Sequence, residues 1–229
     1  MGTVPVSGEP ETGTVPISLV LASASPARLT TLRAAGIDPM VLIANVDEQA
    51  VLSAALATRP GLSPADQVLV LARAKAEAAA SAAPPGAFVL GCDSMLELDG
   101  EVLGKPTGPA DAKARIRQQA GREAVLHTGH WLAGPAPAEG NGGRRGEGAA
   151  SSTTVRFGQM SEAEIDAYVA TGEPLNVAGA FTIDGLGGPF IEGIDGDHHG
   201  VVGLSLPVLR RLLARFGLTV FEFWRPGTL

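Results

Sequence analysis

The chain has 229 residues, of which 45% are hydrophobic and 18% charged, and its formal net charge is −7 at neutral pH. This composition is typical of a globular protein with a full hydrophobic core, and it excludes a fibre, a coiled coil and a disordered chain. The acidic balance also argues against a protein that holds nucleic acid through its phosphates, because such binding needs a basic surface. An anionic ligand would need cations gathered at one place.

The cysteine content and the ends of the chain bear on location. A single cysteine, Cys92, rules out an internal disulfide framework and is typical of a reducing compartment. The first residues have neither the basic nor the apolar part of a secretory signal, and no apolar run is long enough to cross a bilayer. We therefore expect a cytoplasmic protein without a membrane segment.

In the first half of the chain, apolar runs alternate with helical patterns. Residues 1–15 are rich in Gly, Pro, Thr and Glu, and we expect a flexible tail there, before a single domain at 16–229. The elements predicted next, in chain order, are a strand at 17–22, a helix from Ser25-Pro26 to Gly36, a strand at 40–44, a helix at 63–83, a strand at 87–92 and a hairpin of 95–98 and 101–103 around Asp99-Gly100.

The second half continues the alternation, which predicts an α/β fold. Residues 134–150 are Gly-rich and polar, and we expect a mobile loop there. The elements predicted around this loop are a helix at 109–120, a strand at 124–132, a short strand at 155–157, a helix at 161–171, a strand at 190–194, a helix at 206–216 and a last strand at 218–223.

The first candidate site is the strand-to-helix junction that holds Ser23, Ser25 and Arg28. The unpaired amides and the partial positive charge of a helix N-terminus suit a phosphate, and both serine hydroxyls can donate to an anion. Arg28 is unusual there, because a cation in the first turn opposes the helix dipole. A bound phosphate would offset that conflict; the alternative is an ordinary capped helix with a solvated arginine.

Asp93 and Lys75 are the next candidates. Asp93 follows the apolar run 87–92, and open α/β sheets bind ligands at the carboxyl ends of their strands. Its carboxylate could hold a divalent metal or accept a proton from water; the alternative is a turn aspartate that bonds nearby amides. Lys75 continues the apolar stripe of the 63–83 helix, so it either extends outward to solvent or meets an anion.

Two glycine-containing patterns resemble known nucleotide motifs without matching them. The stretch that ends in Gly104-Lys105 is one residue short of a Walker loop, and Pro106 stands where Ser or Thr is required, which argues against a P-loop kinase. Lys105 is then either a solvated lysine in a turn or a residue that contacts a ligand. The Gly-Leu-Gly-Gly stretch at 185–188 lacks the spacing and the following helix of a dinucleotide fingerprint.

Taken in order, these pieces resemble the Maf family of nucleotide pyrophosphatases, over residues 19–216. The resemblance implies an α/β fold of two lobes around a central cleft, with an elongated mixed sheet flanked by helices, a divalent metal, Mg²⁺ or Mn²⁺, and often a homodimer. The stretches that carry it are Leu21-Ala22-Ser23-Ala24-Ser25-Pro26-Ala27-Arg28, Val46-Asp47-Glu48, Leu71-Ala72-Arg73-Ala74-Lys75-Ala76, Gly91-Cys92-Asp93-Ser94, Gly104-Lys105-Pro106, Thr171-Gly172-Glu173-Pro174, Ala178-Gly179-Ala180-Phe181, Gly196-Asp197 and Val201-Val202-Gly203-Leu204-Ser205-Leu206-Pro207.

The resemblance also implies a reaction and roles in it. Water attacks the α-phosphorus of a nucleoside triphosphate, and the products are the monophosphate and pyrophosphate; non-standard nucleotides are candidate substrates. Carried over position by position, Asp93 is the catalytic carboxylate and shares a metal with Glu48. The implied triphosphate contacts are Ser23, Ser25, Arg28, Lys75 and Lys105.

The choice of base involves positions where this chain departs from its relatives. The resemblance links that choice to Ala27, Ser94 and Asp184. Ala27 matches neither the group that prefers dTTP and UTP nor the group that prefers 7-methyl-GTP. The Ser94 hydroxyl favours the pyrimidine group, whereas Asp184, which only accepts hydrogen bonds when ionised, favours a base edge rich in donors. Asn176 and Val177 replace a charged Asp-Lys pair that is common in the family.

A second hypothesis is a non-catalytic nucleotide-binding regulator of cell division or septum formation. The joint presence of Glu48, Asp93 and Lys105 disfavours this alternative, since a chain without catalysis could lose any of them and still fold.

Overall fold

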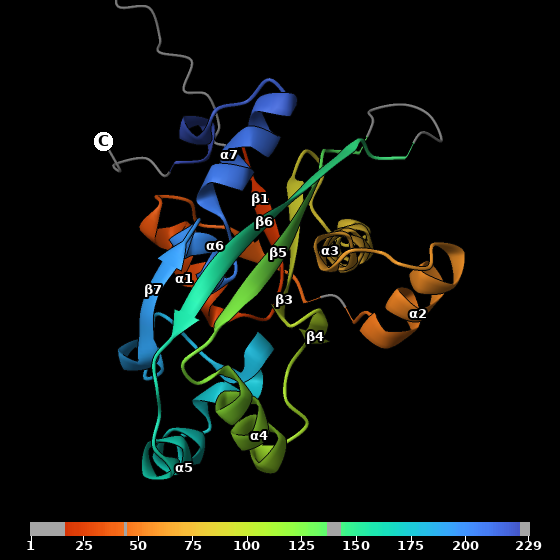
Figure 1. The fold of residues 1–229 in the computed structure, drawn as a ribbon. Coiled ribbons are helices and arrows are strands. Elements are labelled where there is room, and N and C mark those ends of the chain that lie inside the picture. The colour runs from red at the N-terminus through yellow and green to blue at the C-terminus, as the bar shows by residue number, and fades with distance from the viewer. Residues whose placement is uncertain (1–16, 44, 137–142, 225–229) are drawn as a thin grey trace, which may run out of the picture.

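In the computed structural model, which describes residues 17–43, 45–136 and 143–224, a mixed seven-stranded sheet forms the centre of the molecule (Figure 1). The strand order is β2-β1-β3-β5-β6-β7, and β4 also pairs with β3. Strands β2, β1 and β3 run parallel, and the pairs from β3 to β7 are antiparallel. The strands are β1 (Leu19–Ala22), β2 (Met40–Val41), β3 (Phe88–Leu98), β4 (Glu101–Leu103), β5 (Glu123–Ala133), β6 (Gly146–Phe157) and β7 (Ile191–Asp195).

Helices cover both faces of the sheet, and two of them lie beyond one end of it (Figure 1). Helix α3 lies on one face, and α1, α6 and α7 lie on the other, while α4 and α5 pack together near the end of the long strands. The helices are α1 (Pro26–Ala34), α2 (Glu48–Thr58), α3 (Pro64–Ala80), α4 (Pro109–Gln119), α5 (Glu162–Ala170), α6 (His198–Val202) and α7 (Leu206–Arg215), with short 3-10 turns at Glu173–Asn176, Ala178–Ala180, Gly188–Phe190 and Val220–Phe223.

Two glycines let α3 lie unusually close to the sheet. A Cβ atom added at Gly91 of β3 would lie 2.1 Å from the carbonyl oxygen of Ala72, and one at Gly129 of β5 would lie 2.4 Å from that of Val68. Both distances are far below van der Waals contact, so only glycine permits this approach. The close packing brings the side chains of α3 to the middle of β3, where the candidate carboxylate lies.

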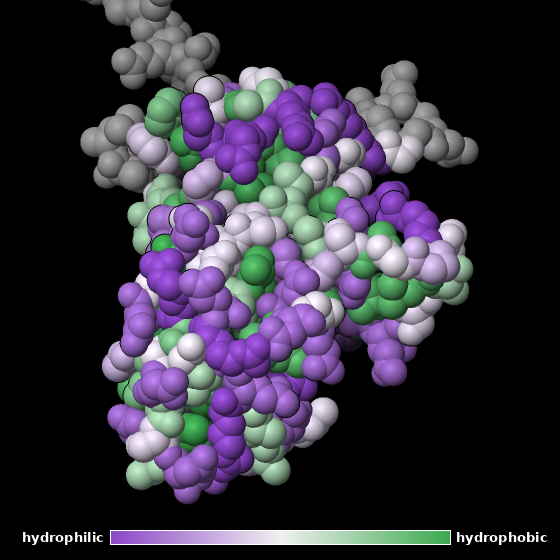
Figure 2. All heavy atoms as spheres, viewed as in Figure 1, coloured by the Kyte–Doolittle hydropathy of each residue, from purple (hydrophilic) through white to green (hydrophobic). Residues whose placement is uncertain are grey.

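The apolar core is divided between the two faces of the sheet. On one face, the leucines of β1 and β3 pack against those of α1 and α7, as in the buried cluster of Leu21, Leu32, Leu90, Leu209 and Leu212. On the other face, small residues of α3 pack against the valines of β1 and β3. Outside, hydrophobic residues occur in small separate groups among hydrophilic ones on the face shown in Figure 2. No helix in the described part of the chain is long and apolar enough to span a bilayer.

Most predicted elements are confirmed, including the hairpin. Leu98 of β3 pairs with Glu101 of β4, which leaves Asp99 and Gly100 as a two-residue turn with φ angles of 53° and 82°. Positive φ at both positions is the geometry that an Asp-Gly turn favours. The strand before this turn is longer than predicted, because β3 runs without interruption from Phe88 to Leu98.

Two predictions from the second half of the chain are wrong. Residues 146–150, assigned to a loop, are the first part of β6 and pair with β5 from Ala133↔Gly146 onward. Glycine is needed at both positions, because a Cβ atom would lie 2.5 Å from the Trp131 ring at Gly146 and 2.6 Å from it at Gly148. The predicted strand at 218–223 contains instead a 3-10 turn, Val220–Phe223, whose Phe223 enters the core. The tail at 1–15 and loop residues 137–142 lie outside the described residues.

Candidate active site

All the site residues predicted from the sequence line one pocket with a volume of about 690 Å³. They come from the β1–α1 junction, the start of α2, the middle of α3 and of β3, the segment after β4, and the segment after α5. The predicted residues that the pocket brings together are Ser23, Ser25, Arg28, Glu48, Lys75, Asp93, Ser94, Lys105 and Asp184.

The pocket opens where one edge of β3 has no partner strand. On that edge, β1 pairs with β3 only as far as Gly91, and β4 pairs with it only from Leu96 onward. Asp93 therefore lies inside β3 and not at its end, which corrects the sequence-based placement. Successive side chains of a strand point to opposite faces, and the gap lets both Asp93 and Ser94 reach the same pocket.

At the centre of the pocket, Lys75 joins two carboxylates. Its Nζ lies 2.5 Å from Asp93 Oδ1 and 2.8 Å from Glu48 Oε1. Lys75 and Asp93 are largely buried, whereas about half of the Glu48 side chain is exposed. Asp47 caps the start of α2 by accepting the Ala50 amide at 2.9 Å, and this cap places Glu48 in the first turn beside Lys75. Of the two alternatives for Lys75, extension to solvent and contact with an anion, the structure shows the second, and the anions are protein carboxylates.

The electrostatics of Asp93 are set by opposing effects. Burial raises the pKa of the Asp93 carboxyl above its ordinary value, and the nearby charges of Lys75 and Arg28 only partly offset that rise. A carboxylate under these conditions binds a proton or a cation more readily than a solvated one. The neighbouring Cys92 is fully buried, and burial raises the pKa of its thiol to about 11, so it is an inert core residue.

Arg28 is held by protein groups from three segments. Its Nε donates to the Gly203 carbonyl at 2.7 Å, Nη1 to the Cys92 carbonyl at 2.9 Å and to Ser23 Oγ at 3.0 Å, and Nη2 to Ser94 Oγ at 3.1 Å. The conflict with the dipole of α1 is therefore relieved by carbonyl and hydroxyl oxygens without a phosphate. The guanidinium braces the β1–α1 junction against β3 and against the turn before α7.

The two serines shape the junction itself. Ser25 caps α1, with its Oγ 3.5 Å from the Arg28 amide, and Ser23 Oγ accepts the Ser25 amide at 3.2 Å. Ser23 Oγ thus accepts from two donors, the amide and the guanidinium, which leaves its own hydrogen for a ligand oxygen.

Sequence reasoning missed Thr128, which is fully buried on β5. Its hydroxyl donates to the Gly200 carbonyl at 2.8 Å, and its Oγ1 lies 2.9 Å from Ser94 Oγ. Because the Thr128 hydrogen is used, Ser94 is the donor of that pair, and it accepts from Arg28 on its other side. The structure gives Ser94 a part in holding Arg28. No local pattern marks Thr128, since its partners lie 34 and 72 residues away.

The remaining pocket wall is mostly apolar. Lys105 is exposed at one side of it and has no hydrogen bond or ion pair with any other described residue. Asp184 is also exposed and lies in the segment after the 3-10 turn Ala178–Ala180. The apolar side chains of the wall include Met95, Leu126, Val177, Ala178, Phe181, Ile183, Val201 and Val202.

The donor set fits a divalent metal that is completed by its ligand. No group of three or more His, Cys, Asp or Glu side chains within 17–43, 45–136 and 143–224 could hold a metal by itself. Glu48 and Asp93 offer two carboxylates that meet at Lys75. Mg²⁺ is commonly bound by one or two carboxylates together with substrate phosphates and water.

Comparison with known proteins identifies the family. The family model described as Maf-like protein matches residues 18–216. Two proteins named nucleoside triphosphate pyrophosphatase are similar to the chain: the one from Salinispora tropica is 52% identical over 94% of this chain and 91% of its own length, and the one from Streptomyces coelicolor is 53% identical over 91% and 95%. The one from Nocardia farcinica is 52% identical over 91% and 97%. The chain therefore belongs to the Maf-like protein family.

Proposed function

We propose that this chain is a nucleoside triphosphate pyrophosphatase, a hydrolase that converts a ribo- or deoxyribonucleoside triphosphate into the monophosphate and pyrophosphate. One observation carries the proposal: a single pocket combines a buried carboxylate, three cationic side chains and an apolar wall. The cations suit a triphosphate and the apolar wall suits a base and its sugar. The relatives that are about half identical to the chain carry the same activity in their names.

The triphosphate would bind across the cationic side of the pocket. Lys105, without a partner among the described residues, is available for phosphate oxygens, and Ser23 offers a free hydroxyl hydrogen. Arg28 uses most of its donors on the protein and contributes mainly a fixed positive charge. Fixed positive charge is most effective where negative charge develops, which here is on the leaving pyrophosphate.

The water attacks the α-phosphorus, so a bond forms between the water oxygen and that phosphorus while the bond to the bridging oxygen breaks. Asp93 accepts the proton of the water, a task for which its raised pKa is suited. Glu48 and Asp93 would hold the divalent metal, Mg²⁺ or Mn²⁺, which supplies charge stabilisation on phosphate oxygens when bound. Lys75 holds the two carboxylates together before the substrate arrives.

The test is hydrolysis of a panel of nucleoside triphosphates in Mg²⁺ or Mn²⁺, with separate detection of pyrophosphate and orthophosphate. We expect pyrophosphate and monophosphate, and loss of both with Asp93→Asn. The matched control is Asp166→Asn, which removes an exposed carboxylate that pairs with Lys113 away from the pocket. Orthophosphate as the only product would mean that a different phosphorus is attacked. Binding of nucleotides without any hydrolysis would favour a nucleotide-binding regulator of cell division.

Several broader features belong to the same proposal. We infer two lobes, one around the sheet with α1, α3 and α7 and one around α4 and α5, with the pocket as the cleft between them. A homodimer and a cytoplasmic location remain predictions, which sedimentation and cell fractionation would test. Clearance of non-standard nucleotides remains a prediction as well, and adding modified triphosphates to the substrate panel addresses it.

A further inference from the structure

The carboxylate of Glu173 accepts hydrogen bonds from four donors. Its Oε1 accepts the Tyr168 hydroxyl at 3.2 Å, the Gly187 amide at 3.2 Å and the Thr182 hydroxyl, and its Oε2 accepts the Leu186 amide at 3.1 Å. Three of these donors belong to the segment 182–187. The segment is therefore folded around a single acceptor that lies at the start of the 3-10 turn after α5.

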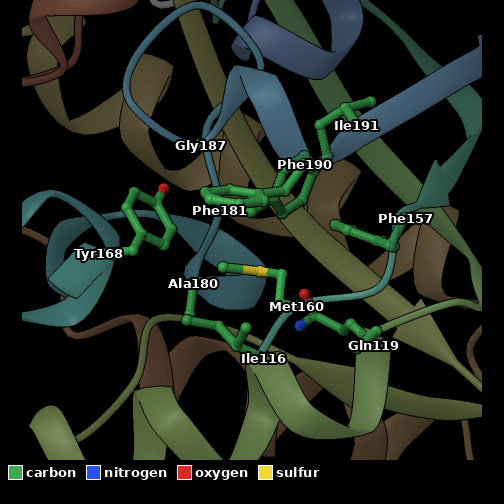
Figure 3. Close-up of a pocket in the computed structure, with 12 residues that line it drawn as sticks. Ile116, Gln119, Phe157, Met160, Tyr168, Ala180, Phe181, Gly187, Phe190 and Ile191 are labelled. Carbon is green, nitrogen blue, oxygen red and sulfur yellow. The ribbon is translucent and has the colours of Figure 1, made fainter. Parts of the chain in front are cut away.

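Two glycines of this segment leave room for the Glu173 carboxylate and for the Tyr168 hydroxyl. A Cβ atom at Gly185 would lie 2.7 Å from Glu173 Oε2, and a Cβ at Gly187 would lie 2.6 Å from the Tyr168 hydroxyl. Figure 3 shows the Tyr168 hydroxyl directed toward the segment at Gly187. The glycine-rich stretch at 185–188, which fits no dinucleotide motif, is explained by this close approach of the backbone to Glu173 and Tyr168.

Apolar packing supports the same segment from behind. The crevice drawn in Figure 3 has a volume of only about 10 Å³, and its lining includes Phe181, Phe190, Tyr168 and Met160. A space of this size holds at most one water, so the segment has no room to collapse inward. Phe181 also lines the large pocket, and it forms the wall between the two spaces.

The segment faces the apolar part of the large pocket. Ile183 and Asp184 both line that pocket, and Ile183 packs with Phe181 and Val201 in one apolar cluster. Asp184 is the charged residue among the pocket-lining residues at 176–184 and 201–203, whereas the three cations lie elsewhere in the pocket. A base on the apolar wall would thus meet one carboxylate able to accept from its polar edge.

We propose that Glu173 is a positioning residue for substrate selection: it holds the segment 182–187 so that the Asp184 carboxylate meets the polar edge of the base. This inference rests on the proposed function, since it assumes that the apolar wall holds the base of a nucleoside triphosphate. Glu173 itself does not line the pocket and acts through the segment.

Glu173→Gln is the informative variant, because it keeps the size of the side chain but replaces one acceptor oxygen by a donating NH₂ group. That group would face an amide or hydroxyl donor, and a pair of donors that face each other loses the hydrogen bond. Tyr168→Phe is the milder variant, since it removes one of the four donors and keeps the ring. Glu162→Gln is the matched control, because Glu162 pairs with Arg117 on the surface of the same region.

The primary readout is the ratio of kcat/KM between the best and the worst triphosphate in a set that differs only in the base. We expect the ratio to fall about tenfold in Glu173→Gln, as expected for loss of one well-placed polar contact, and by less in Tyr168→Phe. Asp184→Ala should lower the ratio similarly, and the double variant should lower it no further. The Leu186 and Gly187 amides should also exchange hydrogen faster in Glu173→Gln than in Glu162→Gln.

An unchanged ratio, with kcat/KM reduced equally for every triphosphate, would overturn the role of Glu173 in selection and leave it a purely structural one. Unchanged exchange of the Leu186 and Gly187 amides would overturn it as well. These results differ from failure of the proposed function, in which the unaltered chain releases no pyrophosphate from any triphosphate.

Discussion

The buried imidazole of His130 allows a quantitative prediction about stability and pH. His130 lies on β5 without exposed surface, and its Nε2 accepts the Ser205 amide at 2.8 Å. Ser205 is the cap of α7, two residues after Gly203, whose carbonyl receives Arg28. A proton added at Nε2 would remove this acceptor, so the neutral imidazole connects the sheet to the turn that braces the pocket.

Burial, and to a lesser extent repulsion by Arg28, lowers the pKa of His130 from 6.5 to about 3. The unfolded chain therefore binds a proton at this residue below pH 6.5, whereas the folded chain stays neutral until about pH 3. The stabilising contribution is fully present above pH 6.5 and is lost as the pH falls toward 3. Between pH 7 and pH 5, this one group should lower the free energy of unfolding by about 2 kcal/mol.

The assay is urea unfolding at several pH values between 5 and 7.5, compared with His130→Gln. Glutamine keeps an acceptor near the position of Nε2 but does not titrate. The quantity to compare is therefore how the free energy of unfolding changes with pH in each protein, and not its value at one pH. We expect the loss of stability from pH 7 to pH 5 to be about 2 kcal/mol smaller in the variant. Equal losses in the two proteins would show that His130 is not held neutral by the fold, and would refute the reasoning.

Three further predictions follow from the same contacts. Lys75→Met should lower the free energy of unfolding at neutral pH by about 3 to 5 kcal/mol in urea unfolding, because it leaves the buried Asp93 carboxylate without its partner. Adding Asp93→Asn to this variant should recover most of the lost free energy, because the carboxylate is then absent as well. Gly91→Ala should cost about 3 kcal/mol or more in the same assay, because the new Cβ would lie 2.1 Å from a carbonyl oxygen of α3. Lys105→Gln should raise KM for triphosphates about tenfold in steady-state assays, because it removes a cation from the pocket. The control Lys113→Gln, at an ion pair away from the pocket, should leave KM unchanged. Equal KM values for the two variants would mean that Lys105 does not contact the phosphates.

Features with a local physical cause were predictable from the sequence. Ser25-Pro26 marks the start of α1 because the cap and the proline act within one turn, and Asp99-Gly100 marks the hairpin because both residues tolerate positive φ. Ser23, Ser25, Arg28, Lys75, Asp93 and Lys105 were candidates from their local patterns alone, whereas Glu48, Ser94 and Asp184 came from the family resemblance. The structure adds that all nine line one space.

Features with a distant cause were missed. The glycines at the start of β6 were assigned to a loop, because the Trp131 ring that requires them lies on another strand, β5. Helix α2 was not predicted because its alanines and leucines are spread around the helix and form no distinct apolar stripe. Thr128 has no local signature, and Glu173 was noted only as part of a family stretch without a role, since each acts through hydrogen bonds to residues that the fold brings together.

The position of the pocket follows from the unequal lengths of neighbouring strands. Because β1 stops at Ala22 and β4 begins to pair only at Leu96, four residues of β3 are left between them with one free edge. The chain that leaves β1 turns away at Ser23, and Arg28 then returns to bond the Cys92 carbonyl on this edge. A longer β1 would cover the edge and bury Asp93 against a strand. The same gap that interrupts the sheet therefore opens the pocket and supplies two of the four oxygens that hold its arginine, those of Cys92 and Ser94.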